Sequence, residues 1–316
     1  MSFDTDAAWA YTESVGDERR HAGRNRDQAR GKHVSGPRRS HLPAPFVIMV
    51  NYTELRDHIK GLGGVVVGYS GGVDSTLVAK AAHDALGERA LAVMVDSCLI
   101  ARCEVAEAEA LAAQLGLSFI RISLDPLQIE QVAANPPDRC YHCKLAVFGR
   151  LVEIARERGL SRVLDGANAD DESDYRPGTA ATAQLGVRSP LKELGIAKDR
   201  VRAISRELGL STWDKASSAC LASRVPYGTA LTPEVLRQVE HAEDALRALD
   251  FDQLRVRHHG DIARIEVPPD DIPRLTDEAT RCKIVAELRL AGYRYVTVDL
   301  MGYRVGSLNE QLRIEN

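Results

Sequence analysis

The sequence of 316 residues predicts an α/β protein, in which a parallel sheet with flanking helices is followed by a small α+β domain. The first observation is that short apolar runs, from residues 65–68 to residues 162–164, alternate with stretches of helical periodicity. Such alternation is typical of βαβ units and therefore of a parallel sheet. The second observation is a change after Trp213 to the order helix, strand, strand, helix, strand, which is typical of a separate α+β domain.

Apolar residues that recur every three to four positions predict the helices of the first domain, and β-branched runs predict its strands. Ligands of a parallel sheet bind at the carboxyl ends of its strands, so Tyr69, Asp96 and Asp165 should lie at one binding edge. A polar loop at 166–178 continues over this edge. The expected elements are a helix from Tyr52, strands ending at Gly68 and spanning 91–95, 117–122 and 162–164, and helices at 104–115, 141–158 and 197–208.

The domain organisation has three parts. Residues 1–48 carry scattered arginines among glycines and prolines without periodicity, so they bury too little surface to offset their ordering entropy. We interpret them as a disordered tail or a start-site extension before Met49, with a basic arm for RNA or a partner as the alternative. Residues 49–214 form the first domain. Residues 215–316 form the second, with expected helix 233–249, strands 254–258 and 262–267, helix 276–291 and strand 295–300.

Composition limits the classes of function. The apolar content of 44% allows full cores, and a net charge of −4 with a pI near 6.2 gives no sign of general nucleic-acid binding. No apolar run reaches the length of about 18 residues that spans a membrane, and the N-terminus lacks the layout of a secretory signal. Six cysteines without such a signal predict a reducing cytoplasm, with thiols for metal sites or catalysis rather than disulfides.

The stretch SGGVDS at 70–75 joins the first strand to a helix. Glycines allow a tight turn, and the free N–H groups and dipole of a helix start favour an anion. Ser70 and Ser75 add hydroxyl donors, while Asp74, with Asp171 of the polar loop, can hold the divalent cation that accompanies a polyphosphate. The spacing differs from the G-x-x-x-x-G-K-[ST] loop of kinases and GTPases. An ordinary glycine-rich turn is the alternative.

The same stretch resembles the pyrophosphatase loop, or PP-loop, of the N-type ATP pyrophosphatases. The resemblance implies that the protein splits ATP between its α and β phosphates and activates a substrate as its adenylate. The candidate ATP-binding residues are Ser70, Gly71, Gly72, Asp74 and Ser75.

Three cysteines form a second candidate site. Cys140 and Cys143 make a C-x-x-C motif at the start of an expected helix, where a thiolate is stabilised, and Cys220 follows much later in the chain. Structural zinc takes four protein ligands and no second C-x-x-C is present, whereas three thiolates suit a [4Fe-4S] cluster with one open iron. A redox pair, half a zinc site and unrelated buried thiols are the alternatives. The remaining cysteines, expected in the core, are Cys98, Cys103 and Cys282.

Four stretches together resemble the LarE family, the ATP-dependent sulfur transferases of lactate-racemase cofactor synthesis. The resemblance runs from about Tyr52 to Asn309. It implies that the protein adenylates a carboxylate of pyridinium-3,5-biscarboxylic acid mononucleotide and converts it to a thiocarboxylate, in a product that later binds nickel. The four stretches are SGGVDS at 70–75, ESDYRPG at 172–178, SRVPYG at 223–228 and RVRHHGDIARIE at 255–266.

One difference from the best-known LarE proteins concerns the sulfur source. Those proteins give up the sulfur of a single cysteine, which aligns with Ala219 here, and they lack cysteines at the positions of Cys140 and Cys143. The chain therefore resembles the three-cysteine kind, in which a [4Fe-4S] cluster on Cys140, Cys143 and Cys220 carries an extra sulfide. Sacrifice of Cys220 is the alternative.

The resemblance also helps to place the substrate phosphate. Arg224, Arg255 and Arg257 carry guanidiniums suited to bidentate phosphate contacts, and Arg255 and Arg257 alternate along a strand and so share one face. Ser223 and Glu243 complete the substrate-site residues that the family implies. A solvated strand face is the alternative. The expected partners are a small mononucleotide and further copies of the chain in a homo-oligomer, without nucleic acid or membrane.

The resulting hypothesis is an ATP-dependent sulfur transferase with ATP, Mg²⁺ and a [4Fe-4S] cluster as cofactors. A tRNA thiolase or an amide-forming synthetase of the same superfamily is the rival enzyme, although the net charge and the lack of a basic stripe argue against tRNA. A nucleotide-binding sensor of iron or redox state is the non-enzymatic rival.

Overall fold

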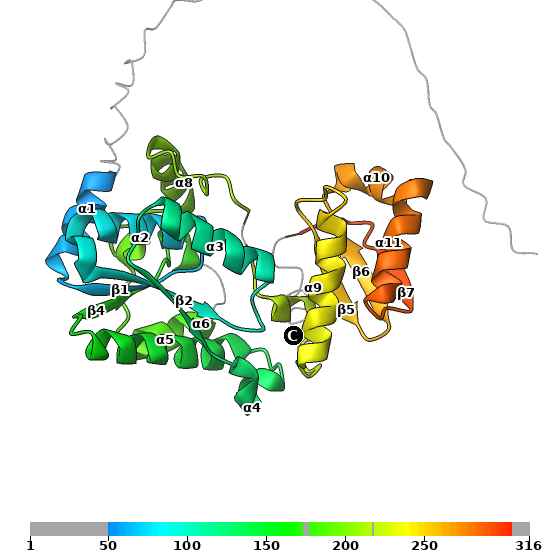
Figure 1. Cartoon of the computed structure of the whole chain (residues 1–316), viewed down its shortest axis with the longest axis horizontal. Helices are drawn as coiled ribbons and strands as arrows, with labels where there is room; N and C mark the ends of the chain where they lie inside the picture. The colour runs from blue at the N-terminus through cyan, green and yellow to red at the C-terminus, as the bar shows by residue number, and fades with distance from the viewer. Residues whose placement is uncertain (1–49, 173–176, 217, 305–316) are drawn as a thin grey trace, which may run out of the picture. The chain divides into compact units, whose positions relative to one another are not determined.

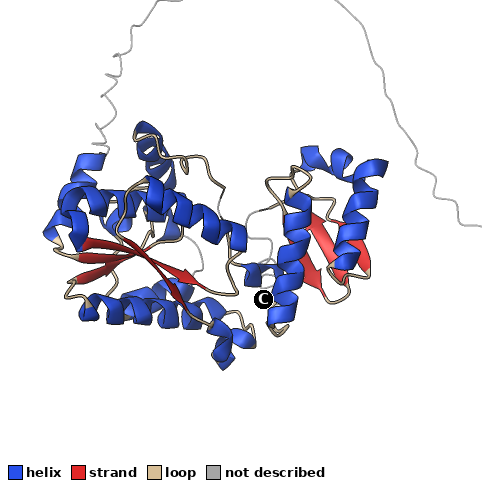
Figure 2. Cartoon of the chain, in the orientation of Figure 1, coloured by secondary structure: helices blue, strands red, loops and turns tan. Residues whose placement is uncertain are grey.

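The computed structural model of the protein describes residues 50–172, 177–216 and 218–304, whose strands form two separate sheets (Figure 1, Figure 2). The first sheet precedes residue 214 and the second follows it, which confirms an α/β part followed by a small part with a mixed sheet. The domain boundary itself stays a prediction. The tail expected at 1–48 lies outside the described residues.

The first sheet has four parallel strands in the order β3-β2-β1-β4. The central strand β1 (Val65–Gly68) has β2 (Ala90–Asp96) and then β3 (Phe119–Ser123) on one side, and β4 (Arg162–Leu164) on the other. The valines of β1 are buried on both faces, as an inner strand of a parallel sheet requires. The strand order reverses between β1 and β4, so their carboxyl ends mark the place where such sheets bind ligands.

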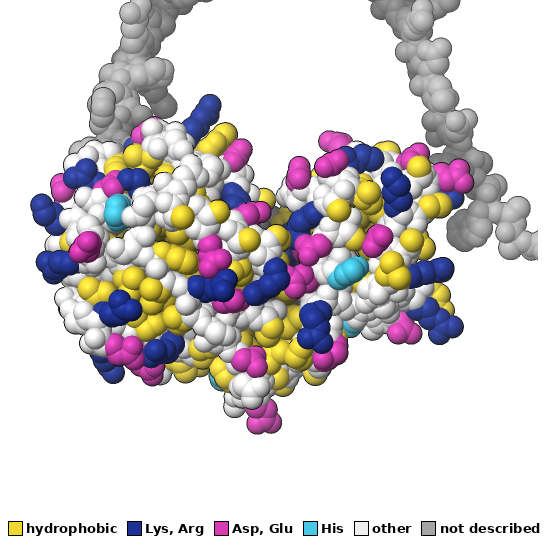
Figure 3. Space-filling model, in the orientation of Figure 1, with side chains coloured by type: hydrophobic (Ala, Val, Ile, Leu, Met, Phe, Trp, Pro, Cys, Tyr) yellow, Lys and Arg dark blue, Asp and Glu magenta, His cyan; other side chains and the backbone are white. Residues whose placement is uncertain are grey.

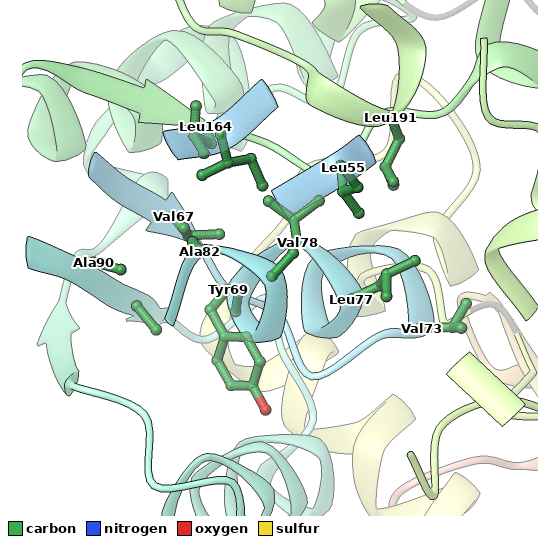
Figure 4. Close-up of a cluster of buried hydrophobic side chains, with 14 of the residues drawn as sticks. Leu55, Val67, Tyr69, Val73, Leu77, Val78, Ala82, Ala90, Leu164 and Leu191 are labelled. Atoms are coloured by element: carbon green, nitrogen blue, oxygen red, sulfur yellow. The ribbon is translucent and has the colours of Figure 1, made fainter. Parts of the chain in front are cut away.

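Helices cover both faces of this sheet (Figure 1). One face carries α1 (Tyr52–Gly61), α2 (Val73–Leu86), α3 (Arg102–Gln114) and α8 (Lys198–Glu207), and the other carries α5 (Arg139–Glu157) and α6 (Pro177–Gln184). Between β1 and α2 the core is built by Val67, Leu77 and Val78 (Figure 4). On the opposite face, Phe148 and Leu151 of α5 pack beneath the strands. The sheet is therefore enclosed on both sides, and its carboxyl edge is left for function.

Short elements connect these layers. α4 (Glu130–Ala133) precedes α5, and α7 (Pro190–Glu193) precedes α8. Arg188, just before α7, forms an isolated parallel bridge with Leu164 and so extends the sheet beside β4. Single turns of 3-10 helix span Gly87–Arg89, Pro126–Gln128, Ala169–Glu172, Leu221–Arg224 and Pro269–Asp271.

The second sheet has three strands in the order β5-β6-β7. β5 (Arg255–His259) is antiparallel to β6 (Ile262–Glu266), which is parallel to β7 (Tyr295–Val298). The helices of this part are α9 (Pro233–Arg247), α10 (Ile272–Thr276) and α11 (Glu278–Leu290). Its separate core contains Leu246, Phe251, Val256, Ile265 and Leu288.

The predicted order of elements is confirmed, with three local corrections. The helix expected at 276–291 begins two residues later, at Glu278, because the Asp277 side chain accepts a hydrogen bond from the Thr280 nitrogen and caps α11, and the short helix α10 before it was not predicted. Cys282 is exposed, so its expected place in the core is wrong. The loop expected to run to residue 178 gives way to α6 at Pro177, and its part at 173–176 lies outside the described residues. None of the described helices is long and apolar enough to cross a membrane.

Candidate functional site

The chain leaves β1 through a tight turn and enters α2, as the sequence predicts. Gly72 is the N-cap residue of α2, and no described side chain caps this helix start. Its first N–H groups therefore stay available to an anion. Ser75 Oγ accepts a hydrogen bond from the Ser70 nitrogen at 3.2 Å and lies 3.0 Å from Ser70 Oγ. Two hydroxyl groups thus meet beside the open helix start.

Two glycines permit the close packing of this turn. Gly71 has a φ of 70°, and a Cβ at this position would lie 2.6 Å from the Ala108 Cβ. At Gly166, in the loop after β4, a Cβ would lie 2.8 Å from the Ser75 nitrogen. Real Cβ atoms do not approach other atoms so closely, so a side chain at either place would push the turn or its neighbour aside. The loops after β1 and β4 therefore touch where the strand order reverses.

Asp74 lies in the first turn of α2 and has two partners from distant parts of the chain. Lys198 Nζ, at the start of α8, donates to its Oδ2 at 2.5 Å, and Asn168 Nδ2, in the loop after β4, donates to its Oδ1 at 3.1 Å. The side chains of Asp74 and Lys198 are 21% and 30% exposed, so a ligand can reach this ion pair. Sequence reasoning missed Lys198 and Asn168, since only the fold brings them to Asp74.

The predicted second carboxylate, Asp171, is connected to the same residues. Its Oδ2 accepts a hydrogen bond from the Asn168 nitrogen at 3.0 Å, while the neighbouring Asp170 accepts one from the Lys198 nitrogen at 2.8 Å. Asn168 therefore contacts both Asp74 and Asp171, through its side chain and its backbone. This arrangement brings the two predicted magnesium ligands, Asp74 on α2 and Asp171 in the loop after β4, to the same asparagine.

The three other residues expected at this edge are found there with different surroundings. Tyr69 is buried, which raises its pKa to about 12, and its hydroxyl donates to the Ala108 carbonyl at 3.2 Å. Asp96 pairs with Arg102 at 2.5 Å. Asp165 is buried, which raises the pKa of its carboxyl, although a hydrogen bond from the Ala167 nitrogen at 3.1 Å opposes this effect. These side chains stabilise the edge around the turn.

The three cysteines predicted to act together are partly buried, and Cys140 and Cys220 each lie near enough to Cys143 to affect its ionisation. Cys140 and Cys143 lie in the first turns of α5, as predicted. Burial, together with the Cys220 and Cys140 thiols acting as like charges, raises the pKa of Cys143 to about 12. Among the residues that the structure describes, no three histidine, cysteine, aspartate or glutamate side chains converge closely enough to hold a metal ion. The three thiols would therefore have to move closer to one another to bind a common metal ion.

Cys220 is held by the residues that follow it. The Leu221 nitrogen donates to the Leu99 carbonyl at 2.8 Å, which ties this segment to the loop after β2. The Arg224 guanidinium donates to the carbonyls of Ala219 and Cys220. Its other nitrogens, Nε and Nη2, form a bidentate pair with Glu243 at 2.9 and 3.0 Å. The backbone around Cys220 therefore depends on one buried ion pair.

This ion pair has almost no contact with water. Arg224 is 1% exposed and Glu243 is fully buried. Burial alone would raise the pKa of Glu243, but the guanidiniums of Arg224, Arg255 and Arg247 lower it below its ordinary value. The carboxylate is consequently charged, and it neutralises the first of the three arginines predicted to bind phosphate.

The other two predicted arginines alternate in β5 but differ in their partners. Arg257 is buried, donates to both oxygens of Glu266 at 3.0 and 2.8 Å, and reaches the Ser223 carbonyl at 2.8 Å. Arg255 is less buried, donates to the Leu254 carbonyl at 2.6 Å and lies over the Tyr303 ring. The structure thus brings Ser223, Arg224 and Arg257 together, and it adds Glu266, which the sequence analysis did not single out.

Similarity to known proteins decides the family. Residues 49–139 match the family model of NAD synthase. Over 258 residues the chain is 43% identical to the pyridinium-3,5-bisthiocarboxylic acid mononucleotide synthase of Lactiplantibacillus plantarum, an overlap of 80% of this chain and 92% of that protein. The chain belongs to the LarE family. It is 42% identical, over 82% of its length and 96% of the relative, to an uncharacterized protein of Synechocystis.

A weaker similarity shows the wider superfamily. One of the subunits of the glutamine-hydrolysing GMP synthase of Archaeoglobus fulgidus is 28% identical over 172 residues, which are 50% of this chain and 54% of that relative. The match to the NAD synthase family covers the PP-loop of this LarE protein. The protein is therefore an ATP-dependent enzyme with a PP-loop α/β fold, as the sequence predicts. The roles of its individual residues stay predictions.

Proposed function

We propose that this LarE protein adenylates a carboxylate of pyridinium-3,5-biscarboxylic acid mononucleotide with ATP, releases pyrophosphate, and converts the acyl adenylate to a thiocarboxylate. The observation that carries the proposal is Asp74, bonded to Lys198 and Asn168 beside an uncapped helix start. N–H groups that can donate hydrogen bonds to an anion, a carboxylate, and an ammonium group that can change partners lie close together there. A polyphosphate with its cation requires such a set of groups. The name of the synthase of L. plantarum supports the choice of substrate.

The PP-loop residues have distinct roles in the first step. The N–H groups of α2, with Gly71 and Gly72 in the turn and the hydroxyls of Ser70 and Ser75, bind the phosphates. Lys198 leaves Asp74 for a phosphate oxygen when ATP binds. Asp74 and Asp171 would hold Mg²⁺, which neutralises the departing pyrophosphate when bound. The substrate carboxylate attacks the α-phosphorus, and the bond from this phosphorus to the bridging oxygen breaks.

The second step replaces oxygen by sulfur. A sulfur nucleophile attacks the acyl carbon of the adenylate, and the bond from this carbon to the phosphate oxygen breaks, so that AMP leaves with the electron pair. Three neighbouring thiols on Cys140, Cys143 and Cys220 match the donor chemistry of a [4Fe-4S] cluster, which would supply a bound sulfide. In the alternative, Cys220 itself attacks, and its Cβ–S bond then breaks with loss of the Cα proton, leaving dehydroalanine.

The substrate phosphate would lie against the small sheet. Arg255 and Arg257, with Ser223 and Arg224, are the residues proposed to face this phosphate, and Glu243 and Glu266 fix the guanidiniums of Arg224 and Arg257. A charge-assisted, bidentate contact suits a phosphate monoester. The molecular face in Figure 3 has lysine and arginine side chains interspersed with aspartate and glutamate, which supports a small-molecule substrate rather than a nucleic acid. We also propose a homo-oligomer in the cytoplasm, where free thiols persist.

Product analysis tests this function. Full-length protein, reconstituted with iron and sulfide without oxygen, is mixed with Mg-ATP and the dicarboxylate mononucleotide. We expect pyrophosphate release that depends on the mononucleotide, and a product in which sulfur replaces a carboxylate oxygen. The proposal is wrong if pyrophosphate is released only when tRNA is added, or if none of the carboxylate substrates tested leads to its release. Several turnovers per chain favour a cluster-bound sulfide, whereas loss of H₂S from Cys220 after a single turnover establishes sacrifice.

A further inference from the structure

Asn135 occupies an unusual position just before α5. It is fully buried and has a φ of 58°, a left-handed conformation that asparagine adopts more readily than most residues. Its side-chain nitrogen donates to the carbonyls of Pro226 at 2.8 Å and Thr229 at 3.0 Å, with a longer contact to Val225 at 3.4 Å. Its backbone carbonyl accepts a hydrogen bond from the Gly228 nitrogen at 2.9 Å. One residue therefore holds most of the segment 225–229.

Arg139, one helical turn later, continues the same connection. Its Nη1 donates to Asn135 Oδ1 and, at 3.2 Å, to the Ala222 carbonyl. The guanidinium also lies 5.7 Å from the centre of the Tyr227 ring. Arg139 immediately precedes Cys140, and Ala222 lies two residues after Cys220. These contacts therefore tie the chain beside the C-x-x-C motif to the chain beside the third cysteine.

The charge of Arg139 has no ordinary counter-ion. The side chain is only 3% exposed, and in the described part of the chain its bonded partners are neutral groups, with no carboxylate among them. Burying a guanidinium without a paired anion is costly. The group that lies beside it and can carry a negative charge is sulfur, since Arg139 Nη2 is 4.0 Å from Cys140 Sγ.

We propose that Asn135 and Arg139 are positioning residues of the thiol site, where they tie the segment after Cys220 to the start of α5 while Arg139 supplies the counter-charge for sulfur ligands. The inference rests on the proposed thiol site and is independent of the adenylation step. A purely structural bridge would need only hydrogen bonds, which neutral side chains make without the cost of a buried charge. A cation held at this place by Asn135 instead suits a site that becomes negative when three thiolates bind a metal.

Cadmium binding tests the inference without ATP, substrate or iron. The parent is the full chain with Cys98→Ala, Cys103→Ala and Cys282→Ser, so that only Cys140, Cys143 and Cys220 remain. Cadmium is a soft cation that thiolates bind, and ultraviolet absorption of the metal–sulfur bonds counts the thiolates attached. We expect one Cd²⁺ per chain with the absorption of three thiolates. The two positioning residues keep the segments that carry these thiols together, so that the thiols need only small movements to share one ion.

Two variants then remove the positioning. Arg139→Gln loses the charge, and Asn135→Asp keeps the size but places a carboxylate beside Arg139 while removing the donor to Pro226 and Thr229. Both should bind Cd²⁺ about 10–100-fold more weakly, the usual effect of removing a partner in the outer shell of a metal site. Arg139→Lys keeps the charge and should recover most of the affinity. The matched control is Arg202→Gln, which removes two guanidinium-to-carbonyl bonds, to Trp213 and Lys215, without touching the segment 222–229 that Asn135 and Arg139 hold.

The outcomes separate this inference from the proposed function. Unchanged cadmium affinity in Arg139→Gln and Asn135→Asp, with only a lower unfolding temperature, would show a structural role and overturn the inference alone. If Arg139→Gln does not fold, the cadmium affinity of Asn135→Asp decides between the two roles. This variant should fold, because its new carboxylate pairs with the buried charge of Arg139. A parent that binds no Cd²⁺ through its three thiols would overturn both the inference and the thiol site, whereas pyrophosphate release would still report on adenylation.

Discussion

The ion pairs beside the parallel sheet and those beside the small mixed sheet differ in their access to water. Lys198 and Asp74 are 30% and 21% exposed, and their pair lies at an edge where a ligand can enter. Arg224 and Glu243 are 1% and 0% exposed, and their pair fixes the carbonyls around Cys220. In the first region a ligand can replace one partner at small cost, because each charge keeps some water. In the second, removal of either partner leaves a buried charge.

This difference suggests two ways of preparing an anion site. The PP-loop provides backbone N–H groups and hydroxyls, with a lysine that can change partners. The small sheet provides guanidiniums whose direction is set in advance by buried carboxylates, such as Glu266 for Arg257. The first suits ATP, which enters and leaves as pyrophosphate and AMP, and the second suits a phosphate that only anchors a substrate. Three substitutions test the distinction, from the largest expected effect to the smallest.

Glu243→Ala should have the largest effect, on stability. It removes the carboxylate that pairs with Arg224 and Arg247 and that also accepts a hydrogen bond from the Val256 nitrogen. Loss of one partner of a buried pair costs roughly 3–5 kcal/mol of unfolding free energy. Urea unfolding checks this value. The control is Glu153→Ala, which removes an exposed partner of Arg150 and should cost about 0–1 kcal/mol. Equal costs for the two variants would remove the contrast between buried and exposed pairs.

Asp74→Asn should have the next largest effect, and on catalysis rather than folding. The variant loses the carboxylate proposed to hold the cation and the partner that positions Lys198. We expect pyrophosphate release to fall about a hundredfold, equivalent to about 2.7 kcal/mol in the barrier. Unfolding free energy should change by less than about 1 kcal/mol, because the pair is partly exposed. Asp84→Asn is the control on the same helix, where Asp84 pairs with Lys80 at 2.6 Å. Equal rates in the two variants would exclude Asp74 from the site.

The fold could be predicted largely from local patterns. Val65, Val66 and Val67 are buried on both faces of the sheet, and a run of β-branched residues indicates such a strand directly. The short helix α10 was not predicted, because its five residues are too few to show a helical period before Asp277 caps α11. Periodicity therefore indicates long amphipathic helices such as α11 and misses single turns beside them.

The candidate site could be predicted where one short stretch makes it, as in SGGVDS at 70–75. Contacts between distant segments could not be predicted in this way. The pairing of Lys198 with Asp74, for example, depends on how α8 packs against α2. For Arg257 the alternation along β5 was predicted, but its burial was not. Its partner Glu266 lies on the adjacent strand, and only the antiparallel register of β5 and β6 brings the two together.

Glu193→Gln should have the smallest effect and a defined pH dependence. Arg188 donates to both oxygens of Glu193 at 2.6 Å, and His58 lies 2.8 Å away. The Arg188 hydrogen bonds are the main reason that the pKa of Glu193 falls from 4.5 to about 2. Since the folded-state pKa is below the unfolded one, this carboxylate stabilises the protein fully above pH 4.5. That stabilisation is lost as the pH falls toward 2.

The side chain of Glu193 is 25% exposed, so solvent screening limits the loss in Glu193→Gln at pH 7 to about 1 kcal/mol. Urea unfolding of both proteins at pH 7 and at pH 3 should show a difference that shrinks in acid, because below pH 4.5 the carboxylate of the unfolded wild-type chain takes up a proton while that of the folded chain stays ionised down to about pH 2. A difference that is constant with pH would mean that Glu193 acts through packing alone. A loss as large as that of Glu243→Ala would mean that bidentate geometry, rather than burial, decides how much an ion pair in this protein stabilises it.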